Sequence, residues 1–190
     1  MRPVIVQEFI SLDGVMQGPG DAKEFPAGGW ARQYICDDHV RLMVEQMQEV
    51  DALLLGRKTY EHFAAVWPSE HDDSGLSKRM NEMPKFVASS TLTVVTWHAT
   101  LLRGDVARAV AALKELPGKG LLLVGSRTLA RYLHQNDLVD EYRLWLHPVI
   151  VGSGERLFDE GLNPALWNLF DVESTGKGVV VATYRRAPRR

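Results

Sequence analysis

The sequence contains a single cysteine, Cys36, among its 190 residues. One thiol cannot form an intramolecular disulfide or a cysteine-based zinc cluster, and this scarcity is typical of proteins of the reducing cytoplasm. Runs of about 20 apolar residues, the length needed to span a bilayer, are absent as well. We therefore expect a cytoplasmic protein with no membrane partner and no bound metal.

An excess of charge of one sign is also lacking. The 22 basic residues are balanced by 24 acidic ones, which gives a formal net charge of −2. A nucleic-acid-binding surface normally needs a basic excess, so nucleic acid is not expected as a partner. No segment rich in proline or serine divides the chain, and residues 1–190 are predicted to form one domain.

The apolar residues alternate between strand and helix periodicity, which is typical of an α/β sheet with crossover helices. The last two predicted strands have no helix between them, so we expect a mostly parallel sheet, flanked by helices, that ends in an antiparallel strand pair. The predicted strands are 4–10, 52–55, 85–88, 94–97, 121–124, 143–151, 168–174 and 179–184, and the predicted helices are 31–50, 59–65, 105–116 and 128–135.

Two predicted strands are followed by the same pattern, a glycine and then polar or basic residues that open a helix. These turns are Gly56-Arg57-Lys58-Thr59 and Gly125-Ser126-Arg127-Thr128. Glycine allows close approach of a ligand, and a helix N-terminus offers free amides and partial positive charge, which together favour phosphate. Because ligands in open α/β sheets bind at the carboxyl ends of strands, we expect both turns to hold one pyrophosphate. Each turn taken alone also fits ordinary helix capping.

The named nucleotide-binding motifs are absent. The sequence has neither a Walker A loop nor a G-x-G-x-x-G motif after a strand, which disfavours kinases and Rossmann dehydrogenases. The segment His71-Asp72-Asp73 is expected to be a solvated loop, because adjacent residues rarely converge on one metal ion.

The order and spacing of several short motifs resemble the dihydrofolate reductase superfamily, and within it the branch similar to the RibD C-terminal domain. The resemblance covers nearly the whole chain and implies a dihydrofolate-reductase-like fold, the use of NADPH and a homodimer. The motifs are SLDG at 11–14, LLGRKTYE at 54–61, SSTL at 89–92, VGS at 124–126, LVDE at 138–141 and PVIVGSG at 148–154.

The resemblance also implies which residues bind NADPH. The two turns would hold the pyrophosphate, and Val124 would line the nicotinamide pocket. Arg57, Ser89 and Ser90 would meet the adenosine ribose and its 2′-phosphate, since a guanidinium and hydroxyls suit a phosphate dianion. The serine pair also fits a simple turn, and Val124 also fits the core of a strand.

The substrate side is marked by candidate residues rather than by a motif. The resemblance places the loop from Asp13 to Gln17 over the nicotinamide, and Asp38, with Asp37 beside it, is the candidate proton donor. The alternative is that these aspartates cap or solvate the helix. The aromatic residues Trp30, Tyr60, Phe63 and Trp67 are candidates for a wall that stacks on a flat heterocycle, although such spacing also fits core residues.

The function expected from these features is reduction of a small molecule with NADPH. The hydride acceptor would be a C=N or C=O bond of a heterocyclic substrate such as a pyrimidine or a pterin. Reductases of riboflavin biosynthesis carry a deaminase domain or recognise a ribose phosphate, and no deaminase zinc motif is present here. The alternatives are a protein of the same fold that binds a nucleotide without turnover, and a purely structural domain.

Overall fold

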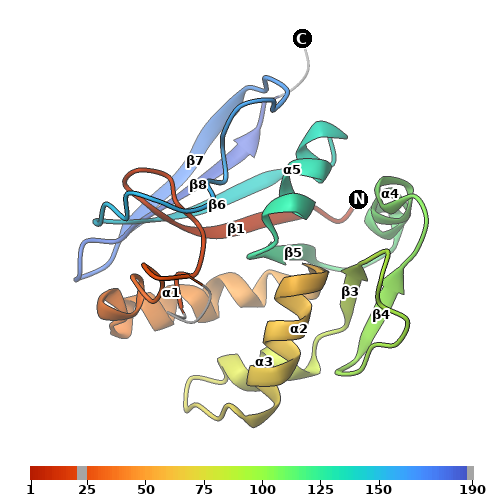
Figure 1. Ribbon diagram of the computed structural model, residues 1–190, viewed down its shortest axis with the longest axis horizontal. Helices are drawn as coiled ribbons and strands as arrows, with labels where there is room; N and C mark the ends of the chain where they lie inside the picture. Colours follow the sequence, from red (N-terminus) through yellow and green to blue (C-terminus); the bar gives the residue numbers. More distant parts are fainter. Residues whose placement is uncertain (21–24, 188–190) are drawn as a thin grey trace.

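Figure 1 shows the computed structural model of the chain, which describes residues 1–20 and 25–187. The described residues form an eight-stranded sheet with the order β4-β3-β2-β5-β1-β6-β8-β7. Its strands are β1 (Val4–Ser11), β2 (Val50–Gly56), β3 (Lys85–Ala88), β4 (Ala99–Leu102), β5 (Gly120–Val124), β6 (Glu141–His147), β7 (Trp167–Ser174) and β8 (Val180–Arg186). The α-helices are α1 (Asp37–Gln48), α2 (Arg57–Val66), α3 (Leu76–Glu82), α4 (Val106–Glu115) and α5 (Arg127–Gln135).

The sheet is parallel from β4 to β6, whereas β8 pairs antiparallel with both β6 and β7. This arrangement confirms the predicted fold class, a mostly parallel sheet that ends in an antiparallel pair. The hairpin of β7 and β8 needs no crossover, which is why no helix separates these strands in the sequence.

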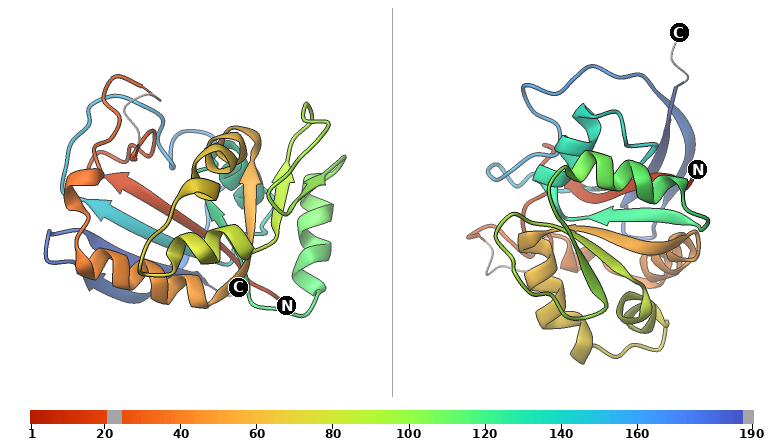
Figure 2. Two further views of the ribbon diagram at one scale, coloured as in Figure 1. Left: turned by 90° about the horizontal axis from the view of Figure 1, so that it is seen from below. Right: turned by 90° about the vertical axis from the view of Figure 1, so that its right-hand side faces the viewer.

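Helices cover both faces of the parallel part of the sheet, as the views in Figures 1 and 2 show. Ile5 of β1 belongs to the same apolar cluster as residues of α1, α2 and α3. Its neighbours Val4 and Val6 point to the opposite face and pack with residues of α4 and α5. Burial on both faces explains why the central strands are continuously apolar in sequence.

The predicted helix 31–50 is wrong in its first third. A short 3-10 turn (Arg32–Tyr34) is followed by Ile35 and Cys36 in extended conformation, and α1 begins at Asp37. Asp37 and Asp38 occupy the first turn of α1, where negative charge is favourable beside the helix dipole. The apolar spacing alone could not reveal this break, because Tyr34 and Ile35 continue the apolar pattern.

The predicted strand 94–97 is also misplaced, since the edge strand β4 lies at Ala99–Leu102. Trp97 and His98 have positive φ angles of 55° and 54°, so the chain turns where the strand was expected. Two further features differ from the prediction. The helix α3 was not predicted. The strand β6 ends at His147 instead of residue 151, because Pro148 has no amide to continue the ladder.

The register places the carboxyl ends of the central strands at one edge of the sheet. Gly56 of β2 lies opposite Ala88 of β3, and Val124 of β5 lies opposite Gln7 of β1. The loops that follow these strands therefore meet, which is where open α/β sheets bind ligands. Among the helices that the structure describes, none is long and apolar enough to cross a membrane.

Candidate functional site

The two glycine-containing turns meet at this edge of the sheet, as expected. The amide of Gly56 donates to Ser126 Oγ at 2.7 Å, and the Ser126 hydroxyl donates to Thr59 Oγ1 at 3.0 Å. Ser126 therefore joins the turn before α2 to the turn before α5. The pair of hydrogen bonds brings two helix N-termini side by side.

Both helix N-termini have amides available for an anion. Gly56 and Ser126 occupy the N-cap positions of α2 and α5, and neither accepts a capping hydrogen bond through a side chain. The first amides of a helix have no intrahelical acceptor, and the helix dipole adds partial positive charge there. Two such termini held together form a suitable cradle for a pyrophosphate.

The packing of the turns explains their glycines. Gly125 has a φ angle of +69°, which side-chain-bearing residues rarely adopt, and a Cβ there would lie 3.2 Å from Thr59 Cγ2. A Cβ on Gly56 would lie 3.3 Å from both side-chain atoms of Ser126. Any side chain at either position would therefore push against the opposite turn.

The basic side chains at the two turns have different surroundings. Arg57 is exposed and forms an ion pair with Glu61 at 3.1 Å, one helical turn away, and Lys58 is also exposed. Arg127, in contrast, donates to the Arg156 carbonyl at 2.7 Å and to the Asp159 carboxylate. Arg57 and Lys58 are thus exposed at the start of α2, whereas Arg127 is held against the 156–159 segment.

The expected ribose-binding serines follow β3 directly. Ser89 Oγ accepts hydrogen bonds from the amides of Thr91 at 3.2 Å and Leu92 at 3.0 Å, which makes the segment a side-chain-stabilised turn. Ser90 is exposed. Because β3 ends beside Gly56, the serine pair and Arg57 lie along the same edge.

The loop after β1 is tied to the segment that follows β6. Asp13 accepts hydrogen bonds from the Ser11 hydroxyl at 2.7 Å and from the amides of Val151 at 3.1 Å and Gly152 at 2.9 Å. These donors, the Ser11 hydroxyl above all, lower the pKa of the Asp13 carboxyl to about 2. Gln17 Oε1 accepts from the Glu155 amide at 3.1 Å. The oxygens of both residues expected at the substrate are therefore engaged in holding the loop.

Asp38, the expected proton donor, lies near the hairpin of β7 and β8. Its carboxylate accepts a hydrogen bond from the Gly176 amide at 3.1 Å. Asp37, beside it, is exposed. The contact ties the first turn of α1 to the turn between β7 and β8.

Of the aromatic residues expected to form one stacking wall, Tyr60, Phe63 and Trp67 belong to one apolar cluster, whereas Trp30 has other neighbours. Trp30 is buried, and its ring lies 5.3 Å from that of His147 at the end of β6. Tyr60 lies in the α2 layer, and its hydroxyl accepts from the Thr96 amide at 2.7 Å. Trp67 packs edge-on against Phe63 at 6.2 Å. A wall that stacks on a substrate stays a prediction for these residues.

A buried cluster that the sequence analysis did not identify lies under the first loop. His39 of α1 and His147 are almost fully buried, with ring centroids 6.0 Å apart, and both pack against Phe9. Desolvation lowers the pKa of His39 to about 4 and also lowers that of His147. The only available signal was that His39 falls on the same helix face as the apolar Leu42.

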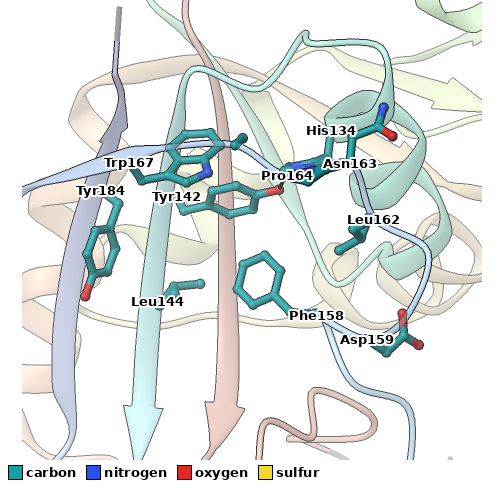
Figure 3. Close-up of a pocket in the computed structure, with 11 residues that line it drawn as sticks. His134, Tyr142, Leu144, Phe158, Asp159, Leu162, Asn163, Pro164, Trp167 and Tyr184 are labelled. Atoms are coloured by element: carbon teal, nitrogen blue, oxygen red, sulfur yellow. Dashed lines mark hydrogen bonds between the residues drawn. The ribbon is translucent and has the colours of Figure 1, made fainter.

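A separate cavity of about 450 Å³ lies on the α5 face, at the antiparallel end of the sheet (Figure 3). Tyr142 lies at its floor, and the Tyr142 hydroxyl is 3.0 Å from His134 Nδ1. Trp167 and Phe158 pack edge-on against the Tyr142 ring at 4.7 and 5.3 Å. Aromatic and aliphatic side chains make up most of the lining of this aromatic cavity, and its Asp159 pairs with Arg127 of the second turn.

Comparison with protein families matches residues 2–181 to the RibD C-terminal domain. This match confirms the resemblance to the RibD C-terminal domain, and the solved structures of similar fold include a dihydrofolate reductase. The fold is shared with a Shewanella sp. PV-4 protein provisionally assigned to riboflavin biosynthesis, with a TM-score of 0.74 and 23% identity over 98% of this chain and 99% of that one.

Two further structures share the fold at lower identity. Dihydrofolate reductase from Enterococcus faecalis, in complex with NADP(H), has a TM-score of 0.63 and 14% identity over 98% of this chain and 97% of that one. A diaminohydroxyphosphoribosylaminopyrimidine deaminase/5-amino-6-(5-phosphoribosylamino)uracil reductase from Thermotoga maritima has a TM-score of 0.63 and 16% identity over 98% of this chain but only 57% of its own length.

Proposed function

Because the chain belongs to the RibD C-terminal domain family, we propose that it is a reductase that transfers a hydride from NADPH to a small heterocyclic substrate. The observation that carries the proposal is the junction of two helix N-termini through Ser126 at the carboxyl edge of the sheet. Such a junction suits the two phosphates of a dinucleotide better than it suits a single anion.

The residues at this edge offer the amide donors and positive charge that suit the phosphates of NADPH. The amides at the starts of α2 and α5 would hold the pyrophosphate, and Gly125, which is exposed, would let it approach the backbone. Arg57, with Ser89 and Ser90 beside it, would bind the 2′-phosphate, and Val124 would line the nicotinamide pocket. NADPH would supply the hydride, and the chain would supply binding and orientation.

We further propose that the hydride acceptor is a C=N or C=O bond of a pyrimidine-like substrate. The name of the Thermotoga relative specifies a uracil derivative, and the family assignment supports the same class here. Asp38 remains the proposed proton donor, although the amide of Gly176 would first have to release its carboxylate. A pterin is the second substrate class.

The test is oxidation of NADPH, followed by its absorbance, in the presence of a panel of phosphoribosylated pyrimidines, free pyrimidines and dihydropterins. We expect turnover with at least one pyrimidine and a lower kcat for Asp38→Asn without loss of NADPH binding. Tight NADPH binding with no oxidation by any compound would instead support the alternative of a nucleotide-binding protein without turnover.

We also propose that the protein is a homodimer. β7 is the outermost strand, and its Leu169 and Val172 are 56% and 54% exposed. They pair with Tyr184 and Ala182 of β8, and Tyr184 lines the aromatic cavity. An exposed apolar edge of this kind favours burial against a second copy.

A further inference from the structure

A charged residue lies in the middle of the apolar strand β1. Glu8 is only 3% exposed and points to the α5 face, because Val6 two residues before it packs in the cluster of α4 and α5. Its Oε2 accepts a hydrogen bond from the Gly125 amide at 3.0 Å. Glu8 therefore lies directly beneath the turn that, in the proposed function, holds the dinucleotide pyrophosphate.

The carboxyl of Glu8 is poorly solvated for an anion. Among the described residues, Oε1 has no hydrogen-bond partner. The carboxyl therefore accepts from one described donor, the Gly125 amide. Burying an ionised carboxylate with so few donors is costly, whereas the neutral acid is tolerated. Burial accordingly raises the pKa of Glu8 to about 8, although the Gly125 amide opposes the shift.

The charged and titratable groups on the elements packed against this face have other partners. Arg127 and Arg131 of α5 both bind Asp159, and Lys114 of α4 pairs with Asp140. Tyr142 of β6 interacts electrostatically with Glu8, but desolvation raises the pKa of its phenol, so it stays neutral. His134 of α5 lies between Tyr142 and the Asn163 carbonyl. Glu8 is thus the buried carboxyl on this face that lies directly against the Gly125 turn.

We propose that Glu8 is a positioning residue for the dinucleotide, which as a neutral acid fixes the Gly125 turn and on ionisation weakens binding of the pyrophosphate. The inference rests on the proposed function, because it assigns the anion to the turn above Glu8. A negative charge beneath the turn repels a bound pyrophosphate through a medium of low dielectric constant. By linkage, NADPH must then favour the protonated form of Glu8.

Glu8→Gln is the decisive variant, because an amide keeps an oxygen for the Gly125 N–H and has nearly the same shape but cannot ionise. NADPH affinity is measured by calorimetry between pH 6.5 and 9.5 for both proteins, and again with NADH, which lacks the titrating 2′-phosphate. We expect the wild-type Kd to rise by about tenfold between pH 7 and pH 9, and the Kd of Glu8→Gln to stay nearly constant.

Other groups that titrate in this range, such as Lys85 with a pKa lowered by burial to about 8, are present in both proteins. Their effect on the Kd is therefore the same in the wild type and in Glu8→Gln, and the difference between the two pH profiles reports on Glu8. Near pH 8 the wild-type protein should also take up protons on binding, seen as a dependence of the binding enthalpy on the buffer, and the variant should not.

Equal pH profiles for the two proteins, with NADPH bound at pH 7, would overturn the role of Glu8 and leave the proposed function intact. Absence of NADPH binding at every pH would instead defeat both. A third outcome would also count against the neutral acid as the form that binds NADPH. In it, Glu8→Gln fails to bind NADPH at pH 7, whereas Glu8→Asp binds NADPH with the pH dependence of the wild type.

Discussion

Arg57 has a counterpart elsewhere in the chain that makes its function measurable. Arg57 pairs with Glu61 at 3.1 Å, and Arg41 pairs with Glu45 at 3.0 Å, each one helical turn apart on an exposed helix surface. The two pairs have nearly the same geometry and exposure. They differ in position, since only Arg57 begins a helix at the carboxyl edge of the sheet.

We therefore expect Arg57→Ala to weaken NADPH binding by about tenfold or more, because a charge-assisted hydrogen bond to the 2′-phosphate is lost. The affinity for NADH, which lacks that phosphate, should fall much less. The measurement is the Kd of both nucleotides by calorimetry, with Arg41→Ala as the matched control. Equal losses of affinity for NADPH and NADH would show that Arg57 does not bind the 2′-phosphate.

Some residues at the site could be predicted from the sequence and others could not. The residues of the two turns could be predicted because glycine and helix-opening residues are local signals. Glu8, His39 and His147 were missed, since their importance arises from burial and from contacts with residues distant in the sequence. A glutamate within the apolar strand VIVQEFI was visible, but its neighbour Gly125 was not.

At the scale of elements, Ser126 links α2 to α5. Its hydroxyl accepts from the Gly56 amide and donates to Thr59, so one side chain fixes the distance between two helix N-termini. The geometry of the proposed cradle depends on this contact.

Ser126→Ala should lower the free energy of unfolding by about 1–3 kcal/mol, because a part-buried amide loses its acceptor. The substitution should also weaken the binding of NADPH and of NADH by similar factors, since both nucleotides contain the pyrophosphate. Chemical denaturation and calorimetry measure the two effects, with Ser69→Ala, which removes an exposed hydroxyl at the end of η2 (Trp67–Ser69), as the control. A loss confined to NADPH would contradict the assignment of this turn to the pyrophosphate.

The elements that the sequence predicted best are those defined by local patterns. The buried strands β2 and β5 each end at or next to a glycine, and the β7–β8 hairpin lacks an intervening helix, so their positions followed from the residues themselves. β4 was misplaced because apolar residues in 94–97 suggested a strand, whereas pairing with β3 begins only after the turn at Trp97 and His98. Strand pairing is a tertiary property that apolar spacing does not encode.

At the scale of the whole molecule, the two ends of the sheet differ in how they are covered. The parallel part is buried between two helix layers, whereas β7 at the antiparallel end has residues that are mostly exposed. The aromatic cavity and the side chains of Leu169 and Val172 lie on one face at this end. The exposed strand β7 lies at the opposite end of the sheet from β4.

If the exposed strand β7 joins two copies, Val172→Lys should convert a dimer to a monomer in light scattering, because a buried unpaired ammonium opposes association. Leu116→Lys is the control, since Leu116 is similarly exposed, at 52%, but lies at the end of α4. A wild-type protein that is monomeric at high concentration, or a dimer unaffected by Val172→Lys, would contradict the proposed interface.

The central claim is that the edge formed by α2 and α5 binds a phosphorylated nicotinamide dinucleotide, and a calorimetric titration of the purified protein with NADPH and then NADH tests it most directly. The sample is first checked for nucleotide that co-purifies. We predict one NADPH per chain with micromolar affinity or better, about −8 kcal/mol, and clearly weaker binding of NADH. Absence of binding by either nucleotide would contradict the claim and leave the fold without its proposed cofactor.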